Sequence, residues 1–525
     1  MSASENVEKL LELAGTKHKY QYILLIISFL TWINCMMIGI CLPFLEKVPD
    51  IVYKNKETNT IISSQLSYEI CDSIPPNEYN ITQTYEYSWV IETDIVCDKI
   101  KTGLIGSIIY FGNFIASITF NIIAEKIGRK STFIFSSIFY CILIIVFVFV
   151  KNYYLILSLS FLSDIFVIFI SFSCLVILEE VTSVHLRGIF GTIVNAGYPC
   201  CALAFFPLFS FLKKWQYVFM VNALVCLILL IIFIFIGYES PRFLISQGKV
   251  DEGIEIIHNL AKFHNLESKY NKLINTQEYK EIIAALRHHE DDDNQDEVST
   301  DKKTKKEKVN FFSLFKYRSI RYKFLILCFL GFSLNGSYNG ISISIKNLPG
   351  DLFQNGMLFY VFEVVVGIFS GWLINTKTLG RKGTIILFYF LAFVSFIIFL
   401  FYDINDRVKI IVVLICKFSI SSVFTIVYPY MLENYPTSIR DLGFGINTAC
   451  DNFGGMTFPM ITELLKEKQL YFVLALINFF EFFLMFFMPE TNGKHLPETI
   501  AELEKNMENE KEMKNSEKKA ELLLL

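Results

Sequence analysis

The sequence predicts an all-α membrane protein whose twelve transmembrane helices form two pseudo-symmetric six-helix halves. Three observations predict this fold: the composition is apolar, the apolar residues gather in long runs, and several charged motifs occur twice. Of the 525 residues, 53% are hydrophobic and only 19% are charged, whereas a soluble domain has about 25% charged residues. The net charge of −4 gives no sign of a nucleic-acid partner, and none is expected.

Twelve apolar runs are each close to the ~20 residues that cross a ~30 Å hydrocarbon core as a helix. They lie at 22–44, 102–124, 132–150, 153–178, 188–212, 216–238, 323–345, 352–375, 383–402, 409–432, 441–462 and 470–488. The first run follows about twenty mostly polar residues, so we do not expect a cleaved signal peptide there.

Basic residues predict the orientation, because Lys and Arg concentrate in cytoplasmic connections. Eight of them lie in alternate short connections: Lys126, Arg129, Lys130, Arg187, Lys377, Arg381, Lys382 and Arg440. These connections are therefore predicted to be cytoplasmic, with both termini on the same side. Four other lysines fall outside in this arrangement: Lys213, Lys214, Lys466 and Lys468.

Polar segments set the predicted domain boundaries. The expected order is a cytoplasmic N-terminus at 1–21, a first half at 22–238 with an outer loop at 45–100, a cytoplasmic loop at 239–322, a second half at 323–488 and a cytoplasmic tail at 489–525. The outer loop holds Cys71, Cys97 and the glycosylation sequon at Asn80, which suit a secretory lumen. Cys71 and Cys97 can form one disulfide within this loop.

The cytoplasmic loop begins with a predicted surface helix and continues as a charged run. Apolar residues at Ile254, Ile257 and Leu260 have helical spacing. His288 and His289 could suggest a metal site, but blocks of like charge follow and no apolar residues accompany them. A solvated charge run is the better interpretation, and no metal or cofactor is expected.

Three motifs recur in the second half at nearly constant distance. Gly-Arg-Lys begins at Gly128 and again at Gly380, 252 residues later. The other motifs follow in the same order: Glu180 with Arg187 recurs as Glu433 with Arg440, and Glu239 recurs as Glu490. A repeat of this length predicts two copies of one six-helix unit, an arrangement typical of transporters.

The charges of these motifs suggest a cytoplasmic gate. The six candidate gate residues are Arg129, Glu180, Arg187, Arg381, Glu433 and Arg440. We expect ion pairs between the halves when the protein faces outward and their separation when it opens inward. The alternative is that these charges only anchor the topology.

Longer motifs carry a resemblance to a known family. The loop after the second span resembles the Gly-x-x-x-Asp-Arg-x-Gly-Arg-Lys loop of the major facilitator superfamily, with Asn121 and Glu125 as departures. The segments "WVIETDIVC", "ESPRFL", "LENYPTSIRDLGFG" and "PETNGKHLPET" resemble the organic ion transporters, which carry organic cations, organic anions or carnitine. The similarity runs from about residue 7 to about residue 500 and implies the major facilitator fold.

Five charged residues lie in the interior of predicted spans, away from the span ends, where each costs about 2.5–3.5 kcal/mol on insertion scales and so indicates a transport pathway. They are Asp164, Glu363, Lys417, Asp451 and Glu481. Glu363 lies near mid-membrane, and the resemblance implies a role in cation binding; the alternative is a stabilising pair with Lys417. Asp164 and Lys417 are 253 residues apart, so we expect them to pair across the cavity. Glu481 has no functional interpretation.

The resemblance also suggests which charge the substrate carries. Organic cation members have Asp two residues before a Gly-Gly pair, and anion and carnitine members have Arg; here Asn452 occupies that place, with Asp451 beside it. Anion carriers add a Lys where this chain has Gly367. Cations or zwitterions are therefore favoured over anions, with Tyr428, which matches a family Tyr, as a further binding residue. Other span aromatics, including Tyr338 and Tyr360, could attract ammonium groups or simply pack.

The predicted function is secondary transport of small organic ions through a lipid bilayer by alternating access. No nucleotide-binding loop and no catalytic motif occurs in the sequence, so an enzyme is not expected. The alternatives are a sugar or other small-solute proton symporter of the same superfamily and a non-transporting receptor. Coupling to a proton or a sodium ion stays open, and we expect the plasma membrane, with an internal vacuole membrane as the alternative.

Overall fold

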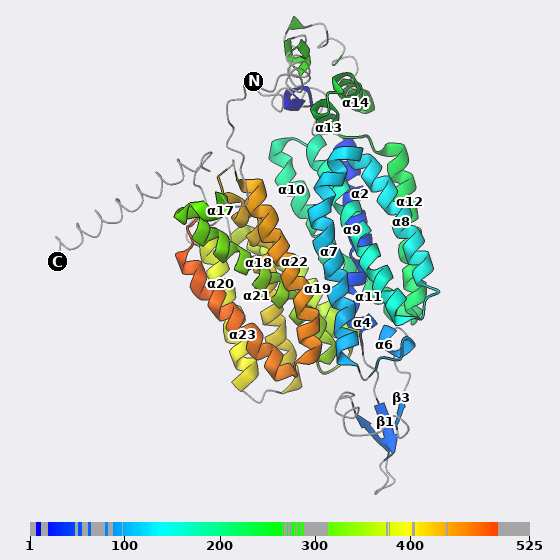
Figure 1. Ribbon diagram of the computed structural model, residues 1–525, viewed down its shortest axis with the longest axis vertical. Helices are drawn as coiled ribbons and strands as arrows, with labels where there is room; N and C mark the ends of the chain where they lie inside the picture. The colour runs from blue at the N-terminus through cyan, green and yellow to red at the C-terminus, as the bar shows by residue number, and fades with distance from the viewer. Residues whose placement is uncertain are drawn as a thin grey trace, which may run out of the picture. The chain divides into compact units, whose positions relative to one another are not determined.

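The computed structural model describes most of the chain. The described residues are 7–11, 19–47, 51–54, 61–64, 79–81, 88–96, 98–264, individual residues between 266 and 287, 313–373, 376, 379–401, 405–436 and 439–491. The chain divides into two compact units, Met1–Lys306 and Glu307–Leu525 (Figure 1). Each unit is described by itself below.

The N-terminal unit is built from long helices and several short ones. Its main helices are α2 (Lys19–Cys35), α7 (Lys99–Ile127), α8 (Arg129–Phe147), α9 (Tyr153–Val181), α10 (Val184–Asn195), α11 (Gly197–Leu212) and α12 (Trp215–Ile236). The shorter ones are α3 (Met37–Ile40), α4 (Leu42–Leu45), α6 (Trp89–Glu92), α13 (Pro241–Ser246) and α14 (Val250–Phe263). The last of these confirms the predicted surface helix, with Ile257 and Leu260 buried.

The described part of the C-terminal unit has six long helices. They are α18 (Arg318–Ser344), α19 (Leu352–Leu373), α20 (Gly380–Phe401), α21 (Asp406–Glu433), α22 (Arg440–Leu464) and α23 (Glu467–Leu484). The short helix α17 (Ser313–Lys316) precedes them, and the 3₁₀ turns η2 (Ile345–Asn347) and η3 (Met485–Phe487) extend α18 and α23.

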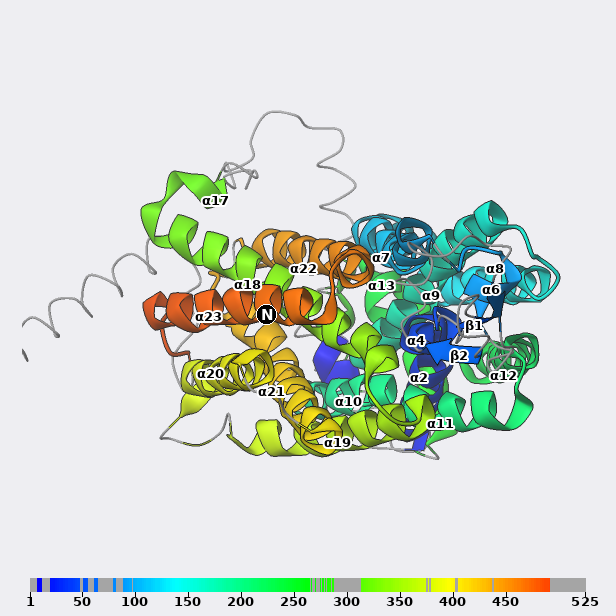
Figure 2. The ribbon, with the colours of Figure 1, turned by 90° about the horizontal axis from the view of Figure 1, so that it is seen from below.

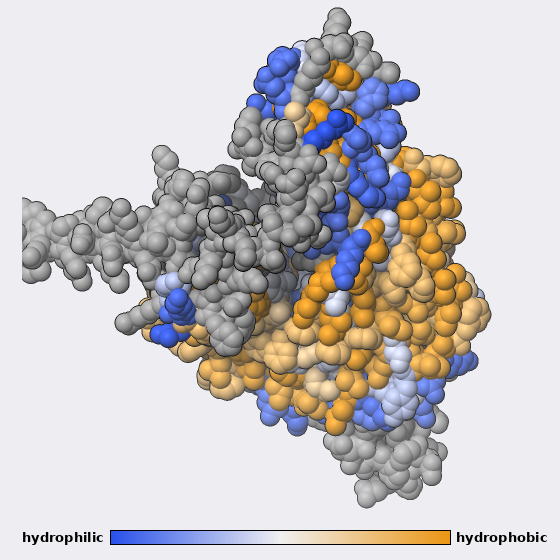
Figure 3. Space-filling view, turned by 45° about the horizontal axis from the view of Figure 1, so that its top comes forward, coloured by the Kyte–Doolittle hydropathy of each residue, from blue (hydrophilic) through white to orange (hydrophobic). Residues whose placement is uncertain are grey.

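These helices confirm the predicted spans. Among the described residues, ten helices are long and apolar enough to cross a membrane. The two other predicted spans are α22 and the series α2, α3 and α4, which is interrupted by turns at Met36 and Cys41. Large apolar side chains remain exposed on the outer faces, as expected for contact with lipid rather than water; examples are Ile118, Ile142, Leu224, Val365 and Phe479. Figure 3 shows this apolar surface in orange.

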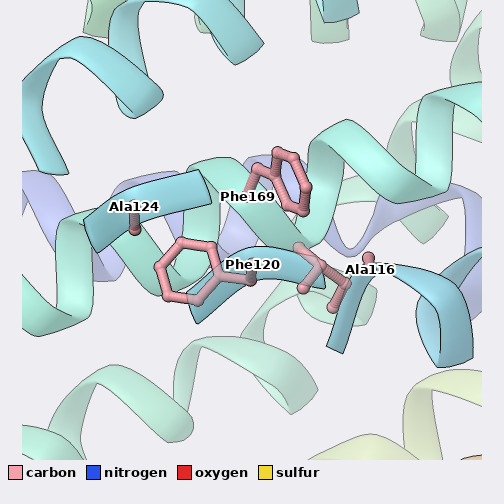
Figure 4. Packing of buried hydrophobic residues seen from close by; sticks show 5 residues of the cluster. Ala116, Phe120, Ala124 and Phe169 are labelled. Atoms are coloured by element: carbon pink, nitrogen blue, oxygen red, sulfur yellow. The ribbon is translucent and has the colours of Figure 1, made fainter. Parts of the chain in front are cut away.

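The two units repeat the same helix contacts. In the N-terminal unit α9 packs on α7, α8 and α2, while α12 packs on α8 and α2. In the C-terminal unit α21 packs on α19, α20 and α18, while α23 packs on α20 and α18 (Figure 2). The contact between α7 and α9 centres on small residues, Ala116 and Ala124, which let Phe120 and Phe169 interlock (Figure 4). The repeated contacts agree with the repeated motifs of the sequence.

A small antiparallel sheet lies in the predicted outer loop, an addition to the all-α prediction. Strands β1 (Ile51–Lys54), β2 (Ile61–Ser64) and β3 (Tyr79–Ile81) are ordered β2-β1-β3, with Val52 opposite Ser63 and Asn80. The backbone of the sequon residue Asn80 is thus part of β3. Cys71 and Cys97 of the predicted disulfide and His288 and His289 lie outside the described residues.

Candidate functional site

The first Gly-Arg-Lys turn binds a carboxylate at the start of α8. The backbone N–H groups of Arg129 and Lys130 donate to Glu239 at 3.1 Å each. Gly128 has φ +92°, and a Cβ at this position would lie 2.5 Å from Glu239 Oε2. Glycine is therefore required both by the backbone conformation and by the approach of the carboxylate. The negative charge also stabilises the helix N-terminus, where backbone N–H groups have no helical partner.

The second turn repeats this arrangement at the start of α20. The backbone N–H groups of Arg381 and Lys382 donate to Glu490, each at 3.0 Å. Gly380 has φ +61°, and a Cβ there would lie 2.6 Å from Glu490 Oε2. The sequence repeat thus corresponds to one structural device made twice: a glycine turn closed by a glutamate that follows the last membrane-spanning helix of its unit.

The gate candidates of the N-terminal unit form contacts within that unit. Arg129 lies 3.5 Å from Glu180. Arg187 donates through Nε to the Glu179 carbonyl at 2.8 Å, and its guanidinium lies 3.5 Å from Glu8. The structure therefore attaches the N-terminal segment to a predicted gate residue. Sequence reasoning missed Glu8, although a single acid among the first described residues gives little signal.

The gate candidates of the C-terminal unit also find partners within their own unit. Arg381 forms an ion pair with Glu433, the counterpart of the Arg129 pair. Arg440 reaches the Tyr435 carbonyl at 3.5 Å. Ion pairs between the halves stay a prediction.

Asp164 is a buried acid on α9. Its Oδ2 atom has no hydrogen-bond partner among the described residues. The helix α7 passes close by, since a Cβ on Gly112 would lie 3.2 Å from the Asp164 Cβ. The expected pair between Asp164 and Lys417 stays a prediction as well, and Lys417 has partners in its own unit.

Lys417, on α21, is enclosed by α18 and α19. Its ammonium donates to Ser342 Oγ at 2.7 Å and lies 3.5 Å from Glu363 Oε2. It also lies 3.0 Å from the centroid of the Tyr338 ring and 5.5 Å from that of Tyr360. The Tyr338 hydroxyl donates to Glu363 Oε1 at 2.7 Å. The side chain of Lys417 is 1% exposed and that of Glu363 is 11% exposed.

Asp451, on α22, has hydrogen-bond donors but no cationic partner among the described residues. Asn335 and the hydroxyl of Tyr428 donate to its Oδ2 atom at 3.0 and 3.2 Å. Its Oδ1 atom is buried without a hydrogen-bond partner among the described residues. The side chain of Asn452 turns back and donates to the Thr448 carbonyl at 3.1 Å. The resemblance singled out Asp451 and Asn452. In the structure it is the Asp451 side chain that contacts Tyr428.

Phe424 connects the two acidic groups. Its ring centroid lies 5.2 Å from that of Tyr338 and 5.5 Å from that of Tyr428. Tyr338 binds Glu363, and Tyr428 binds Asp451, so an aromatic row joins the carboxylates. We call Tyr338, Glu363, Phe424, Tyr428 and Asp451 the acidic–aromatic cluster. Sequence reasoning missed Phe424, because one Phe among 52 carries no signal of its own.

Two further features of the C-terminal unit lie outside this cluster. Glu481 on α23 is buried and accepts a hydrogen bond from Ser333 at 3.2 Å. Lys346 and Glu463 form a buried ion pair between the ends of α18 and α22. Sequence reasoning missed this pair because each residue lies one position beyond the end of a predicted span; a wider margin at the span ends would have found both.

The cluster can hold a positively charged group. Ring faces and carboxylates both attract ammonium ions, and burial strengthens these attractions. A charged side chain within a spanning helix also indicates a transport pathway. The described residues contain no group of three or more His, Cys, Asp or Glu that could hold a metal ion.

Comparisons with known proteins show the family to which the chain belongs. The family model described as Major Facilitator Superfamily matches residues 24–459. Organic cation/carnitine transporter 2 of Rattus norvegicus is 26% identical over 450 residues, 84% of this chain and 75% of the relative. Organic cation transporter 1 of Caenorhabditis elegans is 26% identical over 439 residues, 80% of this chain and 70% of the relative. The resemblance predicted from the motifs is confirmed.

A solved structure shares the fold. The inward-open structure of the xylose transporter XylE from E. coli has a TM-score of 0.62 and covers 91% of this chain and 98% of its own. The sequence identity is 12%, so this likeness concerns the fold alone.

Proposed function

Because the chain belongs to the major facilitator superfamily, we propose that it carries small organic cations or zwitterions across a membrane by alternating access. It is a multi-pass membrane transporter and not an enzyme. The acidic–aromatic cluster is the observation that supports the choice of substrate. The names of the relatives, organic cation and organic cation/carnitine transporters, point in the same direction.

The charge of the cluster favours a cationic group over an anionic one. Glu363 and Asp451 supply two carboxylates; Lys417 pairs with Glu363, while Asp451 accepts hydrogen bonds from Asn335 and Tyr428. A lone anion would meet two like charges in a buried site, which is costly. An ammonium group would instead lie between carboxylates and ring faces.

The membrane potential is sufficient to drive such a carrier. Moving one positive charge through 100 mV yields about 2.3 kcal/mol, which corresponds to roughly fifty-fold accumulation. A coupled proton or sodium ion is therefore not required for a cation, although either would extend the range of substrates. We place the carrier in the plasma membrane, with a vacuole membrane as the alternative.

The cytoplasmic charges provide the proposed gate. In each unit an Arg of the glycine turn pairs with a Glu at the end of α9 or α21. We propose that Arg129, Glu180 and Arg187 of one half exchange partners with Arg381, Glu433 and Arg440 of the other as the carrier changes its orientation. Two bistable sets of ion pairs are sufficient for rocking between two states.

Uptake of tetraethylammonium into vesicles, with the membrane potential set to either sign, tests the proposal. We expect uptake to increase with an interior-negative potential and to fall by tenfold or more in Glu363→Gln, since the variant removes a buried charge worth at least ~1.4 kcal/mol of binding. The matched control is Glu467→Gln, whose parent residue is also paired with a lysine on α21, at 2.8 Å, but lies outside the cluster.

The same vesicles distinguish the alternatives. Uptake of an aromatic carboxylate, without uptake of tetraethylammonium, would contradict the charge argument. Lys417 would then be the next residue to test. Uptake of a sugar driven by a proton gradient would favour the sugar symporter. No uptake of any of these by correctly folded protein would favour the receptor.

A further inference from the structure

The position of Lys417 has a chemical consequence for the substrate. Its ammonium lies within 3.5 Å of the Glu363 carboxylate and 3.0 Å above the centre of the Tyr338 ring, with the Tyr360 ring 5.5 Å away. A carboxylate and two aromatic faces are also the surroundings that an ammonium substrate would require. These surroundings form an ammonium subsite, which is thus occupied by a side chain of the protein.

The contact between Lys417 and Glu363 is close but incomplete. Glu363 Oε1 accepts from the Tyr338 hydroxyl at 2.7 Å, while Glu363 Oε2 is buried without a hydrogen-bond partner among the described residues. The Lys417 ammonium is 3.5 Å from this oxygen and directs a hydrogen bond to Ser342 instead. The lysine therefore neutralises Glu363 without using its second oxygen as an acceptor, and another cation can compete for that place.

We propose that Lys417 is a specificity-determining residue that acts as a tethered competitor: the substrate ammonium displaces the Lys417 ammonium from Glu363 and the Tyr338 ring. This inference rests on the proposed function and deepens it. The four-carbon stem of lysine is flexible, so the displaced ammonium stays near the site. The carrier therefore holds a cation of its own at every stage of substrate binding.

The charge balance then sets the selectivity. A simple cation that replaces Lys417 deprives the buried lysine charge of its Glu363 partner, which is costly. A zwitterion brings a carboxylate that pairs with the displaced Lys417, so the charges of Glu363 and Lys417 both stay paired. The wild-type carrier therefore prefers a zwitterion to a simple cation with the same head group. Without the lysine charge, the simple cation balances Glu363 and the preference reverses.

Choline and glycine betaine provide the test, since both carry a trimethylammonium group and differ in an alcohol or a carboxylate. The ratio of their uptake efficiencies is measured on the same vesicles, so it does not depend on how much carrier folds. We expect wild type to favour glycine betaine. In Lys417→Met the ratio should shift toward choline by about tenfold or more, the factor that ~1.4 kcal/mol represents.

Lys409→Met is the matched control. Lys409 lies on the same helix, pairs with Glu467 at 2.8 Å and lies 5.3 Å from the centroid of the Phe399 ring. The same substitution there removes a lysine, an ion pair and a ring contact, and it should leave the choline to betaine ratio unchanged. An equal ratio in wild type and Lys417→Met would overturn the inference, as would an equal shift in both variants.

If Lys417→Met does not transport either compound, a second measurement tests the inference without it. In purified Glu363→Gln the lysine has no carboxylate partner, so butyrate should raise the thermal unfolding temperature and choline should not. Absence of a butyrate effect would contradict a displaceable Lys417. If wild type carries neither choline, glycine betaine nor tetraethylammonium, the proposed function fails; if wild type carries them and the ratio does not move, only the inference fails.

Discussion

The two units are alike at their predicted cytoplasmic ends and different in their interiors. Both begin a helix with a glycine turn that binds a glutamate, at Glu239 in one unit and at Glu490 in the other. Inside the membrane, the first unit has the acid Asp164, while the second has Glu363, Lys417, Asp451 and Glu481. The two copies share the glycine turns, which support the fold. Most of the charged residues within the spans lie in the second copy.

A buried polar contact illustrates the same difference. In the N-terminal unit the Tyr140 hydroxyl donates to Asn222, which donates to the Asn34 carbonyl at 2.6 Å. In the C-terminal unit the corresponding helices α18 and α23 bring Ser333 to Glu481. Neutral groups hydrogen-bond one another in one copy, whereas in the other copy a carboxyl has one oxygen without a hydrogen-bond partner among the described residues.

The largest expected effect concerns the glycine turns and compares them directly. Gly128 has φ +92° and ψ 158°, a conformation almost restricted to glycine, whereas the φ of Gly380, +61°, is one that a left-handed residue such as Asn also adopts. We expect Gly128→Ala to destabilise the protein by about 3 kcal/mol and Gly380→Ala by about 2 kcal/mol. Thermal unfolding of the purified variants measures both. Equal losses would show that the contact with glutamate, rather than the backbone conformation, dominates.

The second prediction compares the acids of the two interiors. Asp451 has two hydrogen-bond donors and an aromatic connection to Glu363, while Asp164 Oδ2 has no described donor. Asp451→Asn should lower tetraethylammonium uptake by about tenfold, and Asp164→Asn by less than threefold, since only the first removes a charge from the acidic–aromatic cluster. Initial uptake rates of the two variants, measured at equal protein levels, test this prediction. A larger loss in Asp164→Asn would move the substrate site toward the N-terminal unit.

The third prediction concerns the N-terminal segment. Glu8 lies 2.9 Å from Arg242 and 3.5 Å from Arg187, all partly exposed. Glu8→Gln should cost about 0.5–1 kcal/mol of stability, and the loss should shrink at high salt because exposed ion pairs are screened. Unfolding at low and high salt provides the comparison. A loss that salt does not change would indicate packing of the segment, whose Leu10 is fully buried, instead of charge.

The smallest effect is expected for Glu481. It is buried on α23, accepts one hydrogen bond from Ser333 and is not a member of the acidic–aromatic cluster. Glu481→Gln should leave uptake unchanged and alter stability by less than about 1 kcal/mol, because the amide keeps the acceptor and removes a buried acid. Loss of uptake in a stable Glu481→Gln protein would give this residue a role in transport and make the difference between the interiors larger.

Much of the fold could be predicted from the sequence because membrane insertion is a local property. A run of apolar residues crosses the bilayer wherever it occurs, since lipid cannot satisfy backbone hydrogen-bonding groups. The predicted span 153–178 corresponds to α9 (Tyr153–Val181), and the predicted span 409–432 corresponds to α21 (Asp406–Glu433). The break of the first span at Met36 was not predicted, because no Pro or Gly marks that turn.

The candidate site could be predicted only in part. Glu363, Lys417, Asp451 and Tyr428 were identified from rare charges in apolar runs and from the family resemblance. Phe424, Ser342 and Asn335 were not, since Phe, Ser and Asn are unremarkable in a spanning helix and become informative only beside a charged neighbour.

By itself, the sequence determined the number of spans and the duplication, because each depends on residues close together or on a direct repeat. Only the tertiary structure decided that Lys417 lies against Glu363 and Tyr338, and that Phe424 joins Tyr338 to Tyr428. The physical reason is that these contacts depend on how α18, α19, α21 and α22 rotate and pack against one another, and no short stretch of the chain specifies that packing.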